Sequence, residues 1–287
     1  MRENIEFRQV RDFGQLVNDT FVFSKQNLKP LLKSIFIICG FFLVASIVAA
    51  TFYALRVQEG VASGEAESPK TVLGWEYAVS MVFMLLFYTS ISATVFSFIN
   101  LYVQKGNEAP AVEEVWESVK YFFFRVLGSG VLLAILLVVG LMLCVIPGIY
   151  LWPPTSIIMA IIVFENGSFS YAFDRGFKLV KDHWWTTFGA MFIVMLVMVA
   201  ATMVVVLPVA LLTAGSVFIT KTDVSGPIVI LNTVLETAVQ IFYFLPYVAV
   251  ALCYFNLVEL KEGTGLMDRV DMIGQNKPDS DLPEEQY

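Results

Sequence analysis

The chain has 287 residues, of which 57% are hydrophobic and only 15% are charged, and its mean hydropathy is +0.74. A soluble domain has about 25% charged residues, because polar side chains must cover its surface. This composition excludes an ordinary water-soluble protein and indicates that lipid is the solvent. The net charge of −7 comes with no basic stripe, so we expect no nucleic-acid partner.

Six apolar blocks divide the chain, and most are long enough to cross a bilayer. A crossing helix needs about 20 mostly apolar residues for a hydrocarbon core of about 30 Å. The blocks are Leu31–Leu55, Trp75–Val103, Tyr121–Ile146, Ile149–Phe164, Trp184–Leu212 and Ile228–Val258. The third and fourth blocks flank Pro147–Gly148, which predicts a helical hairpin that turns at this dipeptide. We therefore expect an all-α, polytopic membrane bundle of about six transmembrane helices.

Positive charges fall mainly in alternate connections, which indicates the orientation. Lys and Arg are enriched in cytoplasmic loops. With six spans, fifteen of these residues lie on the side of the N-terminus and three on the other side. We therefore expect both termini in the cytoplasm. Moving Ile149–Phe164 alone out of the bilayer would reverse the side of Arg175, Lys178 and Lys181, so the charges favour six spans.

Three amphipathic segments precede the first, third and fifth spans. They lie near residues 9–29, 110–123 and 168–182. Each has apolar side chains at helical spacing and charged side chains opposite, which is typical of helices lying in the membrane interface. Cytoplasmic helices that pack on one another would show the same pattern.

The units that begin with the first and third amphipathic segments align without gaps at an offset of 156 residues. The alignment matches Phe13 with Phe169 and Lys25 with Lys181. An amphipathic helix followed by a hairpin, repeated three times, predicts a pseudo-symmetric bundle. We assign residues 1–263 to this membrane domain. Residues 264–287 are acidic and are expected to be a disordered cytoplasmic tail, or alternatively a tail that docks a partner.

The stretch from Ile146 to Gly189 resembles a known family. It contains a Pro-Gly turn, a span ending near a Glu and a Gly, an amphipathic helix, an aromatic pair and a final Gly. These residues are Pro147, Gly148, Glu165, Gly167, Ala172, Phe173, Arg175, Gly176, Leu179, Trp184, Trp185 and Gly189. With the closing Tyr254-Phe255-Asn256-Leu257, they resemble the membrane domain found beside some bacterial glycerophosphodiester phosphodiesterases.

This resemblance implies a fold and a bacterial inner membrane, but it implies little about activity. Asn256 stands where the family has Asp, and Gly176 stands where it prefers Ser. The phosphodiesterase catalytic domain is absent. We expect Pro147, Gly148, Arg175, Trp184 and Trp185 to be structural rather than catalytic.

The candidate intramembrane polar site is in the sixth block. Asn232, Glu236 and Gln240 fall at i, i+4 and i+8 on one helical face. An acidic residue inside a span is costly, so it is a functional hypothesis by default. This face could bind a cation, relay a proton or meet a polar partner. Alternatively, Glu236 lies in the outer interface, where its charge remains hydrated.

We expect no enzyme activity, cofactor or metal. No span contains His or Asp, and the single histidine, His183, lies beside two tryptophans. The first functional hypothesis is a non-catalytic scaffold or accessory subunit that organises membrane lipid, or a protein partner through the interfacial helices or the acidic tail. The second is a transporter or channel that uses the Asn232, Glu236 and Gln240 face. A membrane-embedded enzyme is the third.

Overall fold

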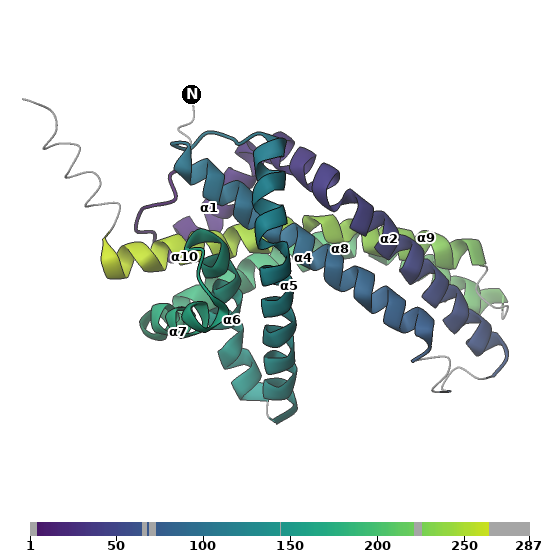
Figure 1. Cartoon of the computed structure of the whole chain (residues 1–287). Helices are drawn as coiled ribbons and strands as arrows, with labels where there is room; N and C mark the ends of the chain where they lie inside the picture. Colours follow the sequence, from purple (N-terminus) through teal and green to yellow (C-terminus); the bar gives the residue numbers. More distant parts are fainter. Residues whose placement is uncertain (1–4, 65–67, 69–72, 144, 221–225, 264–287) are drawn as a thin grey trace, which may run out of the picture.

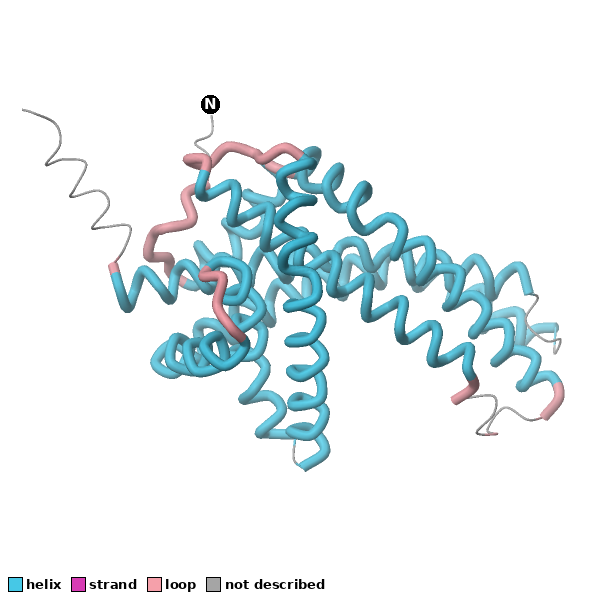
Figure 2. Tube along the Cα trace, in the orientation of Figure 1, coloured by secondary structure: helices cyan, strands magenta, loops and turns pink. Residues whose placement is uncertain are grey.

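The computed structural model describes residues 5–64, 68, 73–143, 145–220 and 226–263, and within these ranges the regular structure is entirely helical (Figures 1 and 2). The elements are α1 (Phe13–Gln26), α2 (Leu28–Ala62), α4 (Trp75–Gln104), α5 (Val112–Leu143), α6 (Val145–Phe164), α7 (Phe169–Val180), η1 (Lys181–His183), α8 (Trp184–Thr220), α9 (Gly226–Val239), η2 (Gln240–Tyr243) and α10 (Phe244–Glu262). The all-α prediction is confirmed. Residues 264–287, the predicted acidic tail, lie outside the described residues.

Among the described residues, six helical segments are long and apolar enough to cross a membrane. They are α2, α4, α5, α6, the segment Phe169–Leu211 and the segment Gly226–Glu262. Each overlaps one of the apolar blocks seen in the sequence. A helix suits this environment because its backbone N–H and C=O groups bond to one another within the segment. Lipid offers no water to bond them instead.

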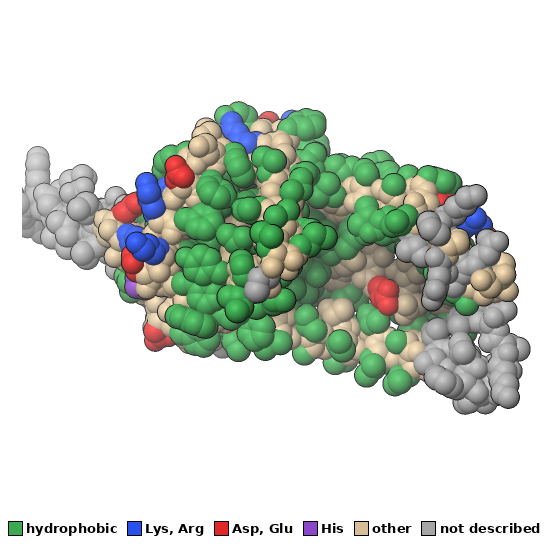
Figure 3. Space-filling view, turned by 90° about the horizontal axis from the view of Figure 1, so that it is seen from below, with side chains coloured by type: hydrophobic (Ala, Val, Ile, Leu, Met, Phe, Trp, Pro, Cys, Tyr) green, Lys and Arg blue, Asp and Glu red, His purple; other side chains and the backbone are tan. Residues whose placement is uncertain are grey.

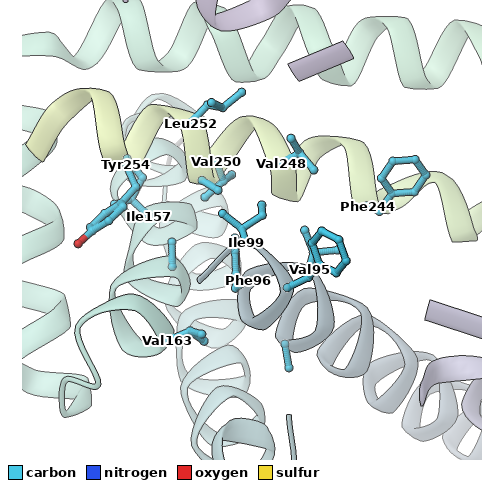
Figure 4. Packing of buried hydrophobic residues seen from close by; sticks show 14 of the residues in the cluster. Val95, Phe96, Ile99, Ile157, Val163, Phe244, Val248, Val250, Leu252 and Tyr254 are labelled. Carbon is cyan, nitrogen blue, oxygen red and sulfur yellow. The ribbon is translucent and has the colours of Figure 1, made fainter. Parts of the chain in front are cut away.

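The centre of the bundle is formed by α4, α6 and α10, which pack against one another pairwise. Figure 4 shows side chains from the three helices meeting there. The fully buried ring of Phe96 lies 5.7 Å from that of Phe164 and 5.6 Å from that of Tyr247, centroid to centroid. Large side chains therefore fill the centre.

The three predicted units, each an amphipathic segment followed by a hairpin, close into a ring around these central helices. The first part of α5 packs on α4, α7 packs on α6, and α1 packs on α10. The amphipathic segment of each unit therefore packs on the last helix of the preceding unit. The Ser118 hydroxyl donates to Ser97 Oγ (2.9 Å) at the α5–α4 contact. α1 and α7 begin 156 residues apart, as do α2 and α8, so these boundaries follow the predicted offset.

Two boundaries in the α5–α6 hairpin differ from the prediction. The amphipathic segment near 110–123 is the first part of the continuous helix α5, because no proline interrupts the chain from Val112 to Leu143. The hairpin does not turn at Pro147–Gly148, because α6 already begins at Val145. Proline is well tolerated in the first helical turn, where its missing N–H would have no helical partner.

The helix α1 is shorter than the predicted segment 9–29. Leu16 and Phe23 are buried, whereas Val10 and Phe13 remain about half exposed. The Asp12 side chain accepts from the Gln15 N–H and fixes the start of α1. In Figure 1 the α5–α6 hairpin points in a different direction from α2, α4, α8 and α9.

Candidate functional site

Glu165 joins three segments at one end of the bundle. It follows α6, and its Oε1 lies 2.5 Å from Nε of Arg175 in α7. Arg175 Nη1 also lies 2.9 Å from Oε1 of Glu262, at the end of α10. The side chains of Glu165 and Arg175 are only 16% and 23% exposed. The guanidinium therefore links two carboxylates and fixes the ends of α6 and α10 relative to α7.

Two tyrosines complete this network. The Tyr254 hydroxyl donates to Glu165 Oε1 at 2.7 Å, and the Tyr171 hydroxyl donates to Oε2 at 2.6 Å. Both oxygens of Glu165 thus have partners. The family pattern had marked Glu165, Arg175 and Tyr254 separately, but only the fold brings them together. We define these residues, with Glu262, as the Glu165 network.

A second polar centre holds the N-terminal segment against α10. The side chain of Arg11 is fully buried, and its Nε lies 2.9 Å from Oδ2 of Asp19. Its Nη atoms donate to the backbone carbonyls of Phe7, Gln9 and Glu6. The Arg11 backbone N–H donates to Oδ1 of Asn256 at 2.7 Å. Asn256 therefore anchors the segment that leads into α1, a role that the sequence had not suggested.

Trp184 replaces a missing backbone hydrogen bond in α6. Pro154 lies inside α6 and has no N–H, so the carbonyl of Tyr150 loses its usual helical donor. The indole N–H of Trp184 donates to that carbonyl at 3.0 Å. The rings of Trp184 and Tyr150 are also stacked, at 5.9 Å. Trp185, the other member of the predicted aromatic pair, is 78% exposed.

Gly148 allows α5 and α6 to approach closely. A Cβ at Gly148 would lie 2.3 Å from Cδ2 of Leu141, and a Cβ at Gly140 would lie 2.9 Å from Leu151. Gly176 has the same function in α7, where a Cβ would lie 2.8 Å from Ile158. Close helix packing therefore accounts for glycine at these positions.

The predicted polar face is only partly assembled. Asn232 and Glu236 lie on α9, and the Asn232 amide donates to Glu236 Oε1 at 2.8 Å. Gln240 is the first residue of the 3-10 segment η2, directly after α9. The amide oxygens of Asn232 and Gln240 are buried without hydrogen-bond partners among the described residues, and Glu236 is exposed.

A cavity of about 300 Å³ lies between the α5–α6 hairpin and the helices α8 and α10. We call it the lateral groove. Its lining is mostly apolar and comprises Gly130, Leu133, Ala134, Leu137, Trp152, Thr155, Ser156, Met159, Met191, Met195, Tyr243, Pro246, Tyr247 and Val250. The hydroxyls of Thr155 and Ser156 donate to carbonyls of their own helix, so they need no hydrogen bond from a ligand.

In the described part of the chain, no group of three or more His, Cys, Asp or Glu side chains is placed to hold a metal ion. No family model, curated protein or solved structure matches the chain. The fold and its apolar helices define the class, an all-α protein built for a membrane. The resemblance to the phosphodiesterase-associated membrane domain remains a prediction.

Proposed function

We propose that the chain is a multi-pass protein of a bacterial inner membrane and a non-catalytic scaffold or accessory subunit that organises membrane lipid. The lateral groove is the observation that carries this proposal. Its walls come from apolar helices that are long enough to lie in hydrocarbon, so its occupant must be apolar. A phospholipid acyl chain has the required shape and chemistry.

The organisation of the rest of the molecule supports this function. Phe96, Phe164 and Tyr247 fill the centre, which favours a rigid frame over a central conduit. The Glu165 network and the buried hydrogen bonds of Arg11, which we call the Arg11 centre, hold the helices together at one end of that frame. The distribution of Lys and Arg in the sequence supports the cytoplasmic placement of both termini.

Filling the lateral groove is expected to release bound lipid. Ala134 lines the groove, and Phe at this position would occupy the space of an acyl chain. We expect the phospholipid retained by Ala134→Phe after gentle detergent extraction to fall about tenfold, which corresponds to about 1.4 kcal/mol of steric cost. Native mass spectrometry of the purified protein measures the retained lipid.

Leu132→Phe is the matched control, because Leu132 lies on the same helix, is 52% exposed and does not line the groove. This variant should retain as much lipid as the natural chain. Equal retention by Ala134→Phe, with the fold intact by circular dichroism, would contradict the proposal that the groove organises lipid.

A transporter or channel is the second candidate, and the pair formed by Asn232 and Glu236 favours it. The Glu236 carboxylate lies beside the amide of Asn232, whose own oxygen is buried and unpartnered, and this pair could hold a cation. For a scaffold, we expect proteoliposomes with an internal pH-sensitive dye to show no proton flux above empty vesicles. Glu59, an exposed acid of α2, provides the control. Flux that is lost in Glu236→Gln but retained in Glu59→Gln would contradict the scaffold proposal and support a transporter.

A further inference from the structure

The apex of the α5–α6 hairpin lies close to charged residues. One cavity of about 530 Å³ is lined on one side by Ile146, Ile149 and Tyr150, at the start of α6. Its other side is formed by residues 181–186, which include Lys181, Asp182 and His183. The first turn of α6 and the start of α8 therefore lie at the same level.

These charged residues belong to the polar end of the bundle. Asp182 Oδ2 lies 2.9 Å from Nζ of Lys261, which stands in the last turn of α10. Lys261 also donates to the carbonyl of Lys178, at 2.5 Å. Because Asp182 and Lys261 are charged, their level is near the membrane surface and not at its centre. Figure 3 shows Lys, Arg, Asp and Glu side chains gathered at this end, while hydrophobic side chains cover the neighbouring face.

The distance from this level to the apex is too short for a full crossing. Trp184 contacts the carbonyl of Tyr150 directly, and Tyr150 is seven residues from Leu143, which is about 10 Å along a helix. A crossing segment must traverse about 30 Å of hydrocarbon. With Trp184 at the membrane surface, the apex therefore reaches only the nearer leaflet.

The other arm of the hairpin is fixed at the same end. Arg125 Nη1 in α5 donates to Oδ1 of Asn166 at 2.6 Å, next to Glu165. Beyond Arg125, one face of the hairpin is apolar and exposed as far as its apex. The exposed fractions are 52% for Leu132, 56% for Ile135, 83% for Met142 and 76% for Ile146. Such a surface requires hydrocarbon around it.

We propose that the α5–α6 hairpin is embedded in the cytoplasmic leaflet alone, where its partner is the layer of acyl chains of that leaflet. The segments α2, α4, α8 and α9–α10 then cross the bilayer, and the exposed Lys181 and Trp185 lie at the headgroup level, as is typical of these residue types. Four crossings keep both termini on one side. The hairpin enters and returns as a unit, so Arg175 and Lys178 also stay in the cytoplasm.

This inference rests on the proposed cytoplasmic side of the termini and extends the proposed function. A hairpin confined to one leaflet adds area to that leaflet only, so it orders lipid on one side of the membrane. Both arms of the same hairpin line the lateral groove.

Single cysteines test the placement of the hairpin. The background carries Cys39→Ala, Cys144→Ala and Cys253→Ala, and the probes are Met142→Cys at the apex and Val61→Cys at the end of α2. Sealed right-side-out vesicles are treated with a membrane-impermeant maleimide. We expect Val61→Cys to react and Met142→Cys to remain at least tenfold less modified. A nitroxide attached at residue 142 should report a depth in the cytoplasmic half of the bilayer.

The hairpin inference is overturned if Met142→Cys reacts as fast as Val61→Cys, or if the nitroxide reports the outer half. Ile146→Cys repeats the measurement should Met142→Cys fail to insert. If only vesicles of the opposite orientation expose Val61→Cys, the proposed side of the termini fails instead. Lipid retention by the lateral groove is measured separately, so the two proposals can fail independently.

Discussion

Replacing Arg11 by Ala is expected to lower the free energy of unfolding by about 3–5 kcal/mol, the cost of removing one partner from a buried charge pair. The Arg11 side chain is fully buried, and that of Asp19 is only 14% exposed. Without the guanidinium, Asp19 keeps a largely buried, unpaired charge. The carbonyls of Phe7 and Gln9 also lose a donor. Reversible unfolding in mixed micelles measures the change.

Arg56→Ala is the control for this prediction. Arg56 pairs with Glu59 at 3.4 Å, but their side chains are 46% and 70% exposed. Such a pair contributes about 0–1 kcal/mol, because water screens both charges. Arg11→Lys should fall between the two, since an ammonium keeps the charge but cannot reach several carbonyls and Asp19 at once. Equal losses for Arg11→Ala and Arg56→Ala would show that the Arg11 centre is not a structural anchor.

The sequence predicts the long helices well because lipid imposes a simple constraint. Every backbone polar group inside hydrocarbon must be satisfied within its own segment, so a long apolar block is a helix. The blocks that begin at Leu31 and Trp75 correspond to α2 and α4. The offset of 156 residues likewise reflects local signals, namely the capped helix starts after Asp12 and Ser168.

Helix breaks were harder to predict, because proline has different effects at different positions. Pro147 lies in the first turn of α6 and breaks nothing, and Pro153 and Pro154 lie inside a continuous helix. Pro246 lies in the first turn of α10, after the 3-10 segment η2 that separates α9 from α10. The sequence contains these prolines, but their effect depends on whether a neighbouring helix supplies the missing donor.

The polar contacts of the site could not be predicted from the sequence, because their partners are distant in the chain. Glu165 and Tyr254 are 89 residues apart, and Arg11 and Asn256 are 245 apart. Composition reports that these residues are unusual in an apolar chain, but not which of them meet. The depth of the α5–α6 hairpin in the membrane also depends on contacts between distant residues. Its length and hydropathy fit a crossing, whereas its proximity to residues 181–186 supports the shallower placement proposed above.

Replacing Trp184 by Phe is expected to lower the free energy of unfolding by about 0.5–1.5 kcal/mol, the net contribution of one hydrogen bond. Phe preserves the stacking on Tyr150 and Phe188 but removes the N–H that reaches the Tyr150 carbonyl. Trp185→Phe is the matched control, because Trp185 is 78% exposed. Unfolding in mixed micelles should show a loss within about 0.5 kcal/mol for this control.

Pro154→Ala identifies the cause of that loss. Alanine restores the N–H that α6 lacks at this position, and this N–H can donate to the Tyr150 carbonyl four residues earlier. In the Pro154→Ala background, Trp184→Phe should therefore be nearly neutral, and the double-mutant cycle should yield a coupling energy of about 0.5–1.5 kcal/mol. If Trp184→Phe costs the same in both backgrounds, the indole acts through packing alone. The proline and the tryptophan would then be independent features of the fold.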